Sequence, residues 1–125
     1  MSNELTMGAS VAYQKGNSPK IDWSKSGKLV TVTGNGTVDG ITVSVATSEQ
    51  AIALGGVTAA GALMFGENLD DTNYIEIRDA TGASNDVIRV GPREPFLFRF
   101  GSDVTAPYWI ANTAACLVKY GLIPL

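Results

Sequence analysis

The sequence predicts an all-β fold, a single-domain antiparallel β-sandwich similar to a jelly roll, with about eight strands over residues 1–125. The chain has 125 residues, 45 % of them hydrophobic, which is enough for one domain with its own core. No stretch keeps apolar residues at the period of a helix for three turns. Short β-rich runs instead alternate with Gly, Asn, Asp and Pro turn signals, a rhythm typical of sandwiches and barrels.

The first part of the chain predicts three strands. Residues 6–14 form the first strand, with Gly8 as a bulge position. Residues 20–24 follow as a short strand, which the polar residues 24–27 stop. Residues 29–33 form the third strand because they are rich in β-branched side chains.

The remaining strands follow at close to regular spacing. Asn-Gly at residues 35–36 and Asp-Gly at residues 39–40 favour tight turns, because these residues tolerate positive φ. Residues 108–111 fit either a short strand or a helical turn. Further strands are predicted at residues 41–45, 51–54, 62–68, 74–78, 87–90, 96–100 and 114–123.

Side-chain patterns predict how some strands lie in the sheets. Residues 63–65 and 114–123 are apolar on both faces, which indicates central strands. Phe96, Phe98 and Phe100 share one face of their strand, so we expect them to face the core.

Missing residue types exclude most catalytic and metal chemistry. The chain has no histidine, which excludes a Ser-His-Asp triad and an imidazole metal site. Its one cysteine, Cys116, excludes an intrachain disulfide, and its apolar neighbours indicate a buried small hydrophobe. We therefore expect a protein that is not an enzyme, with no catalytic residues, no cofactor and no metal.

An Asx-rich segment has two interpretations. Asn68, Asp70, Asp71 and Asn73 place four oxygen-bearing side chains within six residues, and Ca²⁺ prefers such ligands. The glycine and distal glutamate of an EF-hand loop are missing, so the favoured interpretation is a turn stabilised by its own Asx side chains.

Four aromatic residues lie outside the clearest core strands: Tyr13, Trp23, Tyr108 and Trp109. Exposed rings of this kind can bind glycans. Burial in the core or a contact between subunits is the more usual role of such residues in a small chain.

Charge is distributed unevenly. The net charge is −3, but the first 28 residues carry four lysines against two carboxylates, and the remainder is acidic. Residues 1–28 are therefore a candidate lysine-bearing arm for contacts between subunits, although solvated charges that keep a strand edge soluble are the more usual explanation of such lysines. The acidity argues against nucleic acid, and no membrane span is present. The candidate interface residues are Lys15, Lys20, Trp23, Lys25, Lys28, Leu122, Ile123 and Leu125.

Residues 54–125 resemble a family of small virion structural proteins of tailed bacteriophages. The resemblance is carried by LGGVT at 54–58, NLDDTNYIEI at 68–77, VGPREP at 90–95, Phe98-Arg99, and ANTAA at 111–115. Where the family commonly has a Pro-Gly-Glu turn, this chain has Pro92-Arg93-Glu94-Pro95.

The resemblance implies a non-enzymatic β-sandwich that assembles on a phage particle after synthesis in the bacterial cytoplasm. A capsid decoration (cement) protein is the first hypothesis, a homo-oligomer (dimer or trimer) on the head that binds the major capsid protein or other virion proteins. A tail, baseplate or fibre-attachment protein is the second hypothesis. A glycan-binding module for host adsorption is the third.

Overall fold

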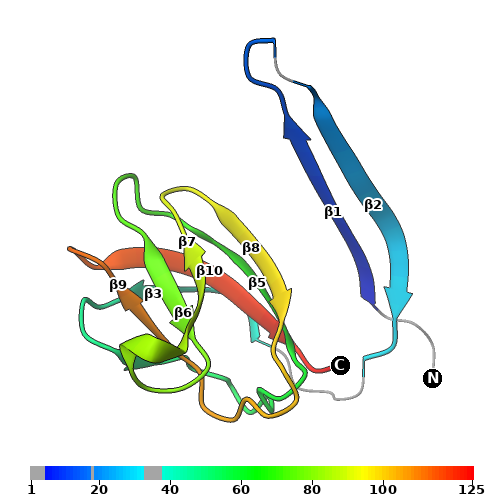
Figure 1. The fold of residues 1–125 in the computed structure, drawn as a ribbon. Helices are drawn as coiled ribbons and strands as arrows, with labels where there is room; N and C mark the ends of the chain where they lie inside the picture. The colour runs from blue at the N-terminus through cyan, green and yellow to red at the C-terminus, as the bar shows by residue number, and fades with distance from the viewer. Residues whose placement is uncertain (1–4, 18, 33–37) are drawn as a thin grey trace. The chain divides into compact units, whose positions relative to one another are not determined.

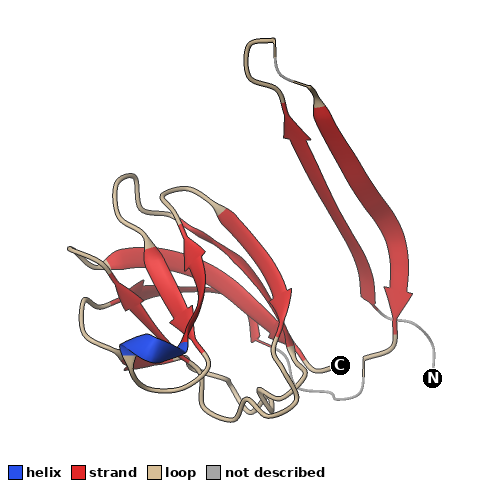
Figure 2. Ribbon diagram, in the orientation of Figure 1, coloured by secondary structure: helices blue, strands red, loops and turns tan. Residues whose placement is uncertain are grey.

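The chain forms two separate compact units. The computed structural model describes residues 5–17, 19–32 and 38–125, and the chain divides into the units Met1–Thr33 and Gly34–Leu125 (Figure 1). The described residues are all-β (Figure 2). The sandwich occupies the second unit, because the first two strands hydrogen-bond only to each other.

The N-terminal unit is a β-hairpin. Its strands are β1 (Leu5–Tyr13) and β2 (Ile21–Val30), which pair antiparallel. The pairing shifts between Met7 and Ala9, so that Gly8 lies opposite two residues, Ser26 and Gly27. Gly27 has φ 76°, a conformation that glycine adopts readily and that this kind of bulge uses.

This bulge corrects two sequence expectations. Residues 24–27 do not end a strand, and residues 29–33 do not begin a separate one. β2 continues through residues 24–27 and ends at Val30, because the bulge accommodates the extra residue while pairing with β1 is maintained on either side.

The second unit is a sandwich of two four-stranded antiparallel sheets. One sheet has the order β3-β10-β5-β8 and the other the order β4-β9-β6-β7. The first contains β3 (Val38–Val45), β10 (Cys116–Ile123), β5 (Leu63–Asn68) and β8 (Pro95–Arg99). The second contains β4 (Gln50–Ala51), β9 (Tyr108–Ala111), β6 (Ile75–Arg78) and β7 (Asp86–Val90).

Strand pairing in the sandwich is nested. The first strand, β3, pairs with the last, β10, and β4 pairs with β9. Inside these pairs, β5 pairs with β8, and innermost β6 pairs with β7. The eight strands therefore follow the pairing order of one long antiparallel hairpin that is folded into two sheets.

Several sequence expectations are settled by this topology. β5 and β10 are central strands, as their apolar character on both faces predicted. Residues 108–111 form a strand rather than a helical turn. Asp39-Gly40 is not a turn but part of β3, where Gly40 (φ 59°) lies at a shift in pairing with β10. The expected turn at residues 35–36 lies outside the described residues.

Side chains from the inner faces of both sheets form one core. Val118, Tyr120 and Leu122 of β10 are almost fully buried, and the Trp109 ring meets the Tyr120 ring edge-on at 5.0 Å between centroids. The Phe96 and Phe100 side chains are buried and Phe98 packs against the core, as predicted. Leu122, by contrast, was expected at an interface. Its 0 % exposure places it in the core, where it packs between the sheets.

Helical structure is minimal in the described part of the chain. It consists of one 3-10 turn at Ala83–Asn85 (Figure 2). No helix among these residues has the length and hydropathy that a membrane crossing requires.

Candidate functional site

The Asx-rich segment forms a self-contained turn. The Asp70 carboxylate accepts hydrogen bonds from the backbone N–H groups of Thr72 at 3.0 Å and Asn73 at 2.6 Å. These bonds hold the pKa of Asp70 below its ordinary value. The interpretation as a turn is confirmed. No group of three metal-ligating side chains occurs among the residues that the structure describes.

Asn68 links this turn to the loop after β7. The side chain is fully buried, and its Nδ2 donates to the carbonyl oxygens of Asn73 at 2.8 Å and Gly91 at 3.1 Å. Its Oδ1 accepts from the backbone N–H of Asp70 at 3.0 Å. This role was missed from the sequence, because the partner at position 91 is far along the chain.

A cluster of three charged side chains connects three segments of the sandwich. The Arg78 guanidinium is almost buried and donates Nη1 to Glu49 at 2.7 Å and Nε to the Asp86 carboxylate. Glu49 also accepts from the backbone N–H of Gly82 at 2.7 Å. Because every member binds another, the cluster is structural, and no sequence pattern predicted it.

The same hydrogen bonds shift the acid–base behaviour of the cluster. The Gly82 N–H and then Arg78 lower the pKa of Glu49. A hydrogen bond shared with Glu76 lowers the pKa of Asp86 and raises that of Glu76. The Arg78 guanidinium is held charged, its pKa raised by Glu49 and Asp86.

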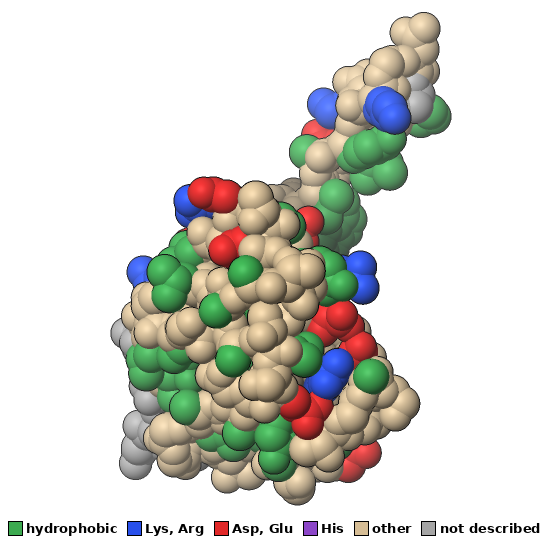
Figure 3. All heavy atoms as spheres, turned by 90° about the vertical axis from the view of Figure 1, so that its left-hand side faces the viewer, with side chains coloured by type: hydrophobic (Ala, Val, Ile, Leu, Met, Phe, Trp, Pro, Cys, Tyr) green, Lys and Arg blue, Asp and Glu red, His purple; other side chains and the backbone are tan. Residues whose placement is uncertain are grey.

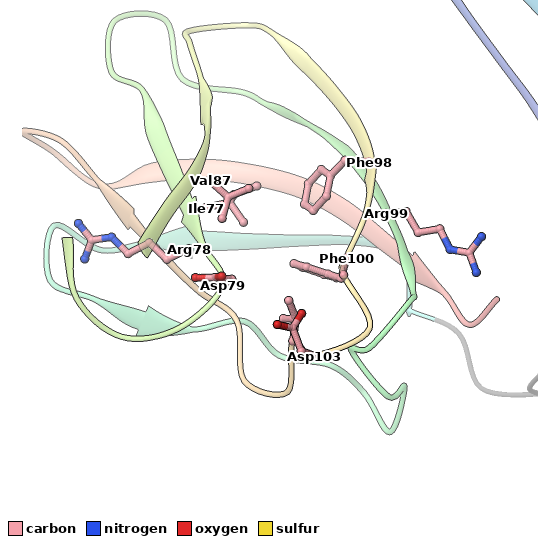
Figure 4. Close-up of a pocket in the computed structure, with 10 residues that line it drawn as sticks. Ile77, Arg78, Asp79, Val87, Phe98, Arg99, Phe100 and Asp103 are labelled. Atoms are coloured by element: carbon pink, nitrogen blue, oxygen red, sulfur yellow. The ribbon is translucent and has the colours of Figure 1, made fainter. Parts of the chain in front are cut away.

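A small cavity opens between the edges of the two sheets. Its volume is about 170 Å³, below the roughly 300–1,000 Å³ of typical ligand pockets. Figure 4 shows the Arg78 and Arg99 side chains pointing away from it on opposite sides. It is lined by Ile77, Arg78, Asp79, Val87, Phe98, Arg99, Phe100, Gly101, Asp103 and Val104.

The structure separates the remaining candidate residues by burial. Cys116 is fully buried, which raises the pKa of its thiol and confirms the small-hydrophobe interpretation. Trp109 is only 1 % exposed, so it is not a glycan platform. Tyr13 and Trp23 are exposed on the hairpin, and Tyr108 is half-buried.

The predicted interface residues fall into two groups. Lys15, Lys20, Trp23, Lys25 and Lys28 all lie in the hairpin unit and are exposed. Lys20 lies 3.6 Å from the Asp22 carboxylate. Ile123 and Leu125 are half-buried at the end of the sandwich unit. Leu122 is fully buried in the core and is therefore not accessible to another subunit.

The hairpin presents one apolar face and one polar face. Alternate residues of β1 point the same way, and residues directly opposite each other in the pairing share a face. The bulge at Gly27 adds one residue to β2, so that the residues of β2 on either side of it still face the same way as their partners in β1. The apolar hairpin face consists of Leu5, Met7, Ala9, Val11, Tyr13, Ile21, Trp23 and Val30, with Lys25 and Lys28 among them.

This face is open to solvent. Val11, Tyr13, Ile21 and Trp23 are each 49–54 % exposed. Figure 3 shows hydrophobic side chains exposed along the hairpin. The opposite face carries one large apolar side chain, Leu29, among small and polar ones: Thr6, Ser10, Ala12, Asp22 and Ser24. The alternation is visible in the sequence of β1, LTMGASVAY, and would have predicted this surface.

Comparison of the chain with protein-family models, with curated proteins and with solved structures finds no match in any of the three. The resemblance of residues 54–125 to phage virion proteins therefore stays a prediction.

Proposed function

We propose that this chain is a non-enzymatic structural protein of a bacteriophage particle, most specifically a capsid decoration protein that oligomerises on the head. The observation that carries the proposal is the apolar hairpin face on a unit separate from the sandwich. A two-stranded hairpin is marginally stable in water unless its face packs against something. Exposed apolar surface of this kind marks an interaction site.

The topology of the sandwich supports the same function. The nested pairing of eight strands in two sheets supports the proposal of a jelly roll, an architecture found in viral capsid and lectin domains. A decoration protein works through many copies, so each copy needs only a modest contact with the capsid.

Immunogold electron microscopy of intact particles from the source tests the proposal. An antibody against this chain is expected to label the head over its whole surface. Label confined to the tail would replace decoration by the tail or baseplate hypothesis. Particles without label would overturn the virion assignment.

A stability assay tests the cement role itself. Capsids that lack this chain should rupture at a lower temperature and under milder osmotic shock than complete capsids. Equal resistance of the two kinds of capsid would contradict the role.

A further inference from the structure

The small cavity between the sheet edges combines an apolar side with an acidic side. Phe98 and Phe100 contribute to the apolar side, and their rings meet edge-on at 5.0 Å between centroids. Val87, which is 60 % exposed, also lines the cavity, so its mouth is apolar as well. Figure 4 shows Asp79 and Asp103 on the lower side of the cavity. A bound molecule would therefore meet hydrocarbon on one side and carboxylates on the other.

The carboxylate of Asp79 lacks a partner. Its Oδ1 is buried and accepts no hydrogen bond from the part of the chain that the structure describes. Neither Asp79 nor Asp103 forms an ion pair with a described residue. A buried carboxylate oxygen without a donor is unfavourable, and most such atoms in proteins have one. The cavity thus contains an acceptor that a bound donor would satisfy.

The two arginines at the cavity do not supply this donor. The guanidinium of Arg78 binds Glu49 and Asp86, and Arg99 donates Nε to the Gly61 carbonyl oxygen at 2.8 Å. Both side chains point away from the cavity (Figure 4). Together with the two aspartates of the cavity, four carboxylates lie around these two guanidinium groups, a formal charge of −2. This surplus favours a positively charged ligand.

The lining of the cavity fits an organic cation better than a metal ion. Ca²⁺ takes about six to eight oxygen ligands, and the described lining residues include two aspartates. An alkylammonium ion packs its hydrocarbon on apolar side chains and directs its N–H groups to carboxylates. The cavity volume of about 170 Å³ is several times the roughly 30 Å³ of one water molecule, so a chain of about five heavy atoms fits.

We propose that this cavity binds a primary ammonium group carried on a short aliphatic chain. The ammonium binds Asp79 and Asp103, and the chain packs on Phe98 and Phe100. A free amine and the side chain of a lysine from another protein share this chemistry. The inference goes beyond the proposed function and does not depend on it, because it concerns the cavity of the sandwich alone.

Titration of the full chain with n-butylammonium at constant ionic strength, followed by ¹H–¹⁵N NMR, tests the proposal. Saturable shifts are expected at the backbone amides of residues 77–79 and 98–104, which include the lining residues of two cavity segments. A ligand of about five heavy atoms is expected to bind at about millimolar concentration. n-Butanol has the same hydrocarbon without the charge and should give no saturable shift.

Two variants remove the charge of the cavity and keep the shape of the side chain. Asp79→Asn and Asp103→Asn should each weaken n-butylammonium binding by about tenfold or more, because one charged hydrogen-bond partner is lost. Asp71→Asn is the matched control, since Asp71 pairs with Arg93 outside the cavity, and it should bind as the wild type does. Thermal unfolding checks that all three variants fold. A wild type without saturable shifts, or cavity variants that bind as tightly as the wild type, would overturn the proposal.

Two further ligands identify the source of the ammonium group. Nα-acetyl-lysine N-methylamide carries the lysine side chain on a peptide backbone. Its binding at the same amides assigns the cavity to a lysine of a partner protein, and its exclusion while n-butylammonium binds assigns the cavity to a free amine. Both results support an ammonium site. Displacement of n-butylammonium by Ca²⁺ at equal concentration would overturn it in favour of a metal site.

Discussion

Asn68 shows how one buried polar side chain organises a loop region. Its amide fills the space between two turns and supplies the hydrogen bonds that their carbonyl oxygens need. A buried carbonyl group without a partner costs about 1–3 kcal/mol. The sequence placed Asn68 in a turn, but its partner Gly91 lies 23 residues away, in a segment that only the fold brings near.

Asn68→Ala should lower the free energy of unfolding by about 2–4 kcal/mol, because at least two carbonyl groups lose their donor. Urea denaturation measures the change. Asn85→Ala is the matched control, because Asn85 makes one exposed side-chain bond, to the Thr81 carbonyl oxygen. Equal losses in the two variants would contradict the role assigned to Asn68.

The Glu49 carboxylate, which is hydrogen-bonded in the Arg78 cluster, makes the stability of the fold depend on pH. Its pKa in the folded chain lies below the ordinary value of 4.5, so it stabilises the fold above that pH and loses this contribution as the pH falls through the folded pKa. Asp70 and Asp86 act in the same direction. Glu76, whose pKa is raised, acts in the opposite direction and offsets part of the loss.

Glu49→Gln should therefore be less stable than the wild type at neutral pH and should lose less stability between about pH 5 and pH 3. Thermal unfolding across this range is the measurement. Parallel pH profiles for the two proteins would show that the Glu49 carboxylate does not contribute.

At the scale of elements, the sequence predicted strands well wherever side chains alternate. The sequence predicted two strands in particular, the one that holds Phe96 and Phe98 and the central strand β10. Burial on one or both faces of a strand produces a recognisable pattern of apolar residues. β2 and β3 were misjudged because glycine bulges look like turns in sequence. Gly27 and Gly40 adopt positive φ while the strands around them stay paired.

The lysines of the hairpin make assembly sensitive to charge. Reversal of Lys20, Lys25 and Lys28 to Glu should weaken attachment to capsids at physiological salt, because the contact loses its complementarity with an acidic surface. Co-sedimentation with capsids that lack this chain measures the effect. High salt should also weaken the attachment of the wild-type chain to capsids. Dissolved ions already screen exposed charges beyond about 8 Å at 0.15 M, and added salt shortens this distance. Binding that is insensitive to both changes would contradict an electrostatic contribution.

At the scale of the whole molecule, the all-β sandwich followed from composition and rhythm, but the division into two units did not. The change in charge after residue 28 indicated a candidate arm, but no sequence signal marks the boundary at residue 33, and the polar segment at residues 24–27 suggested a strand end inside β2. The nested pairing of β3 with β10 and β4 with β9 joins residues far apart in sequence, which local patterns cannot specify. The Arg78 cluster was missed for the same reason, since Glu49 lies 29 residues away.

The central claim is that the apolar hairpin face becomes buried when the chain oligomerises. Hydrogen–deuterium exchange of the wild type, measured by mass spectrometry at increasing protein concentration, tests it most directly. Peptides from β1 and β2 should exchange more slowly as the concentration rises, while peptides from the buried strand β10 should not change. Hairpin peptides that exchange at one rate at every concentration would contradict the claim.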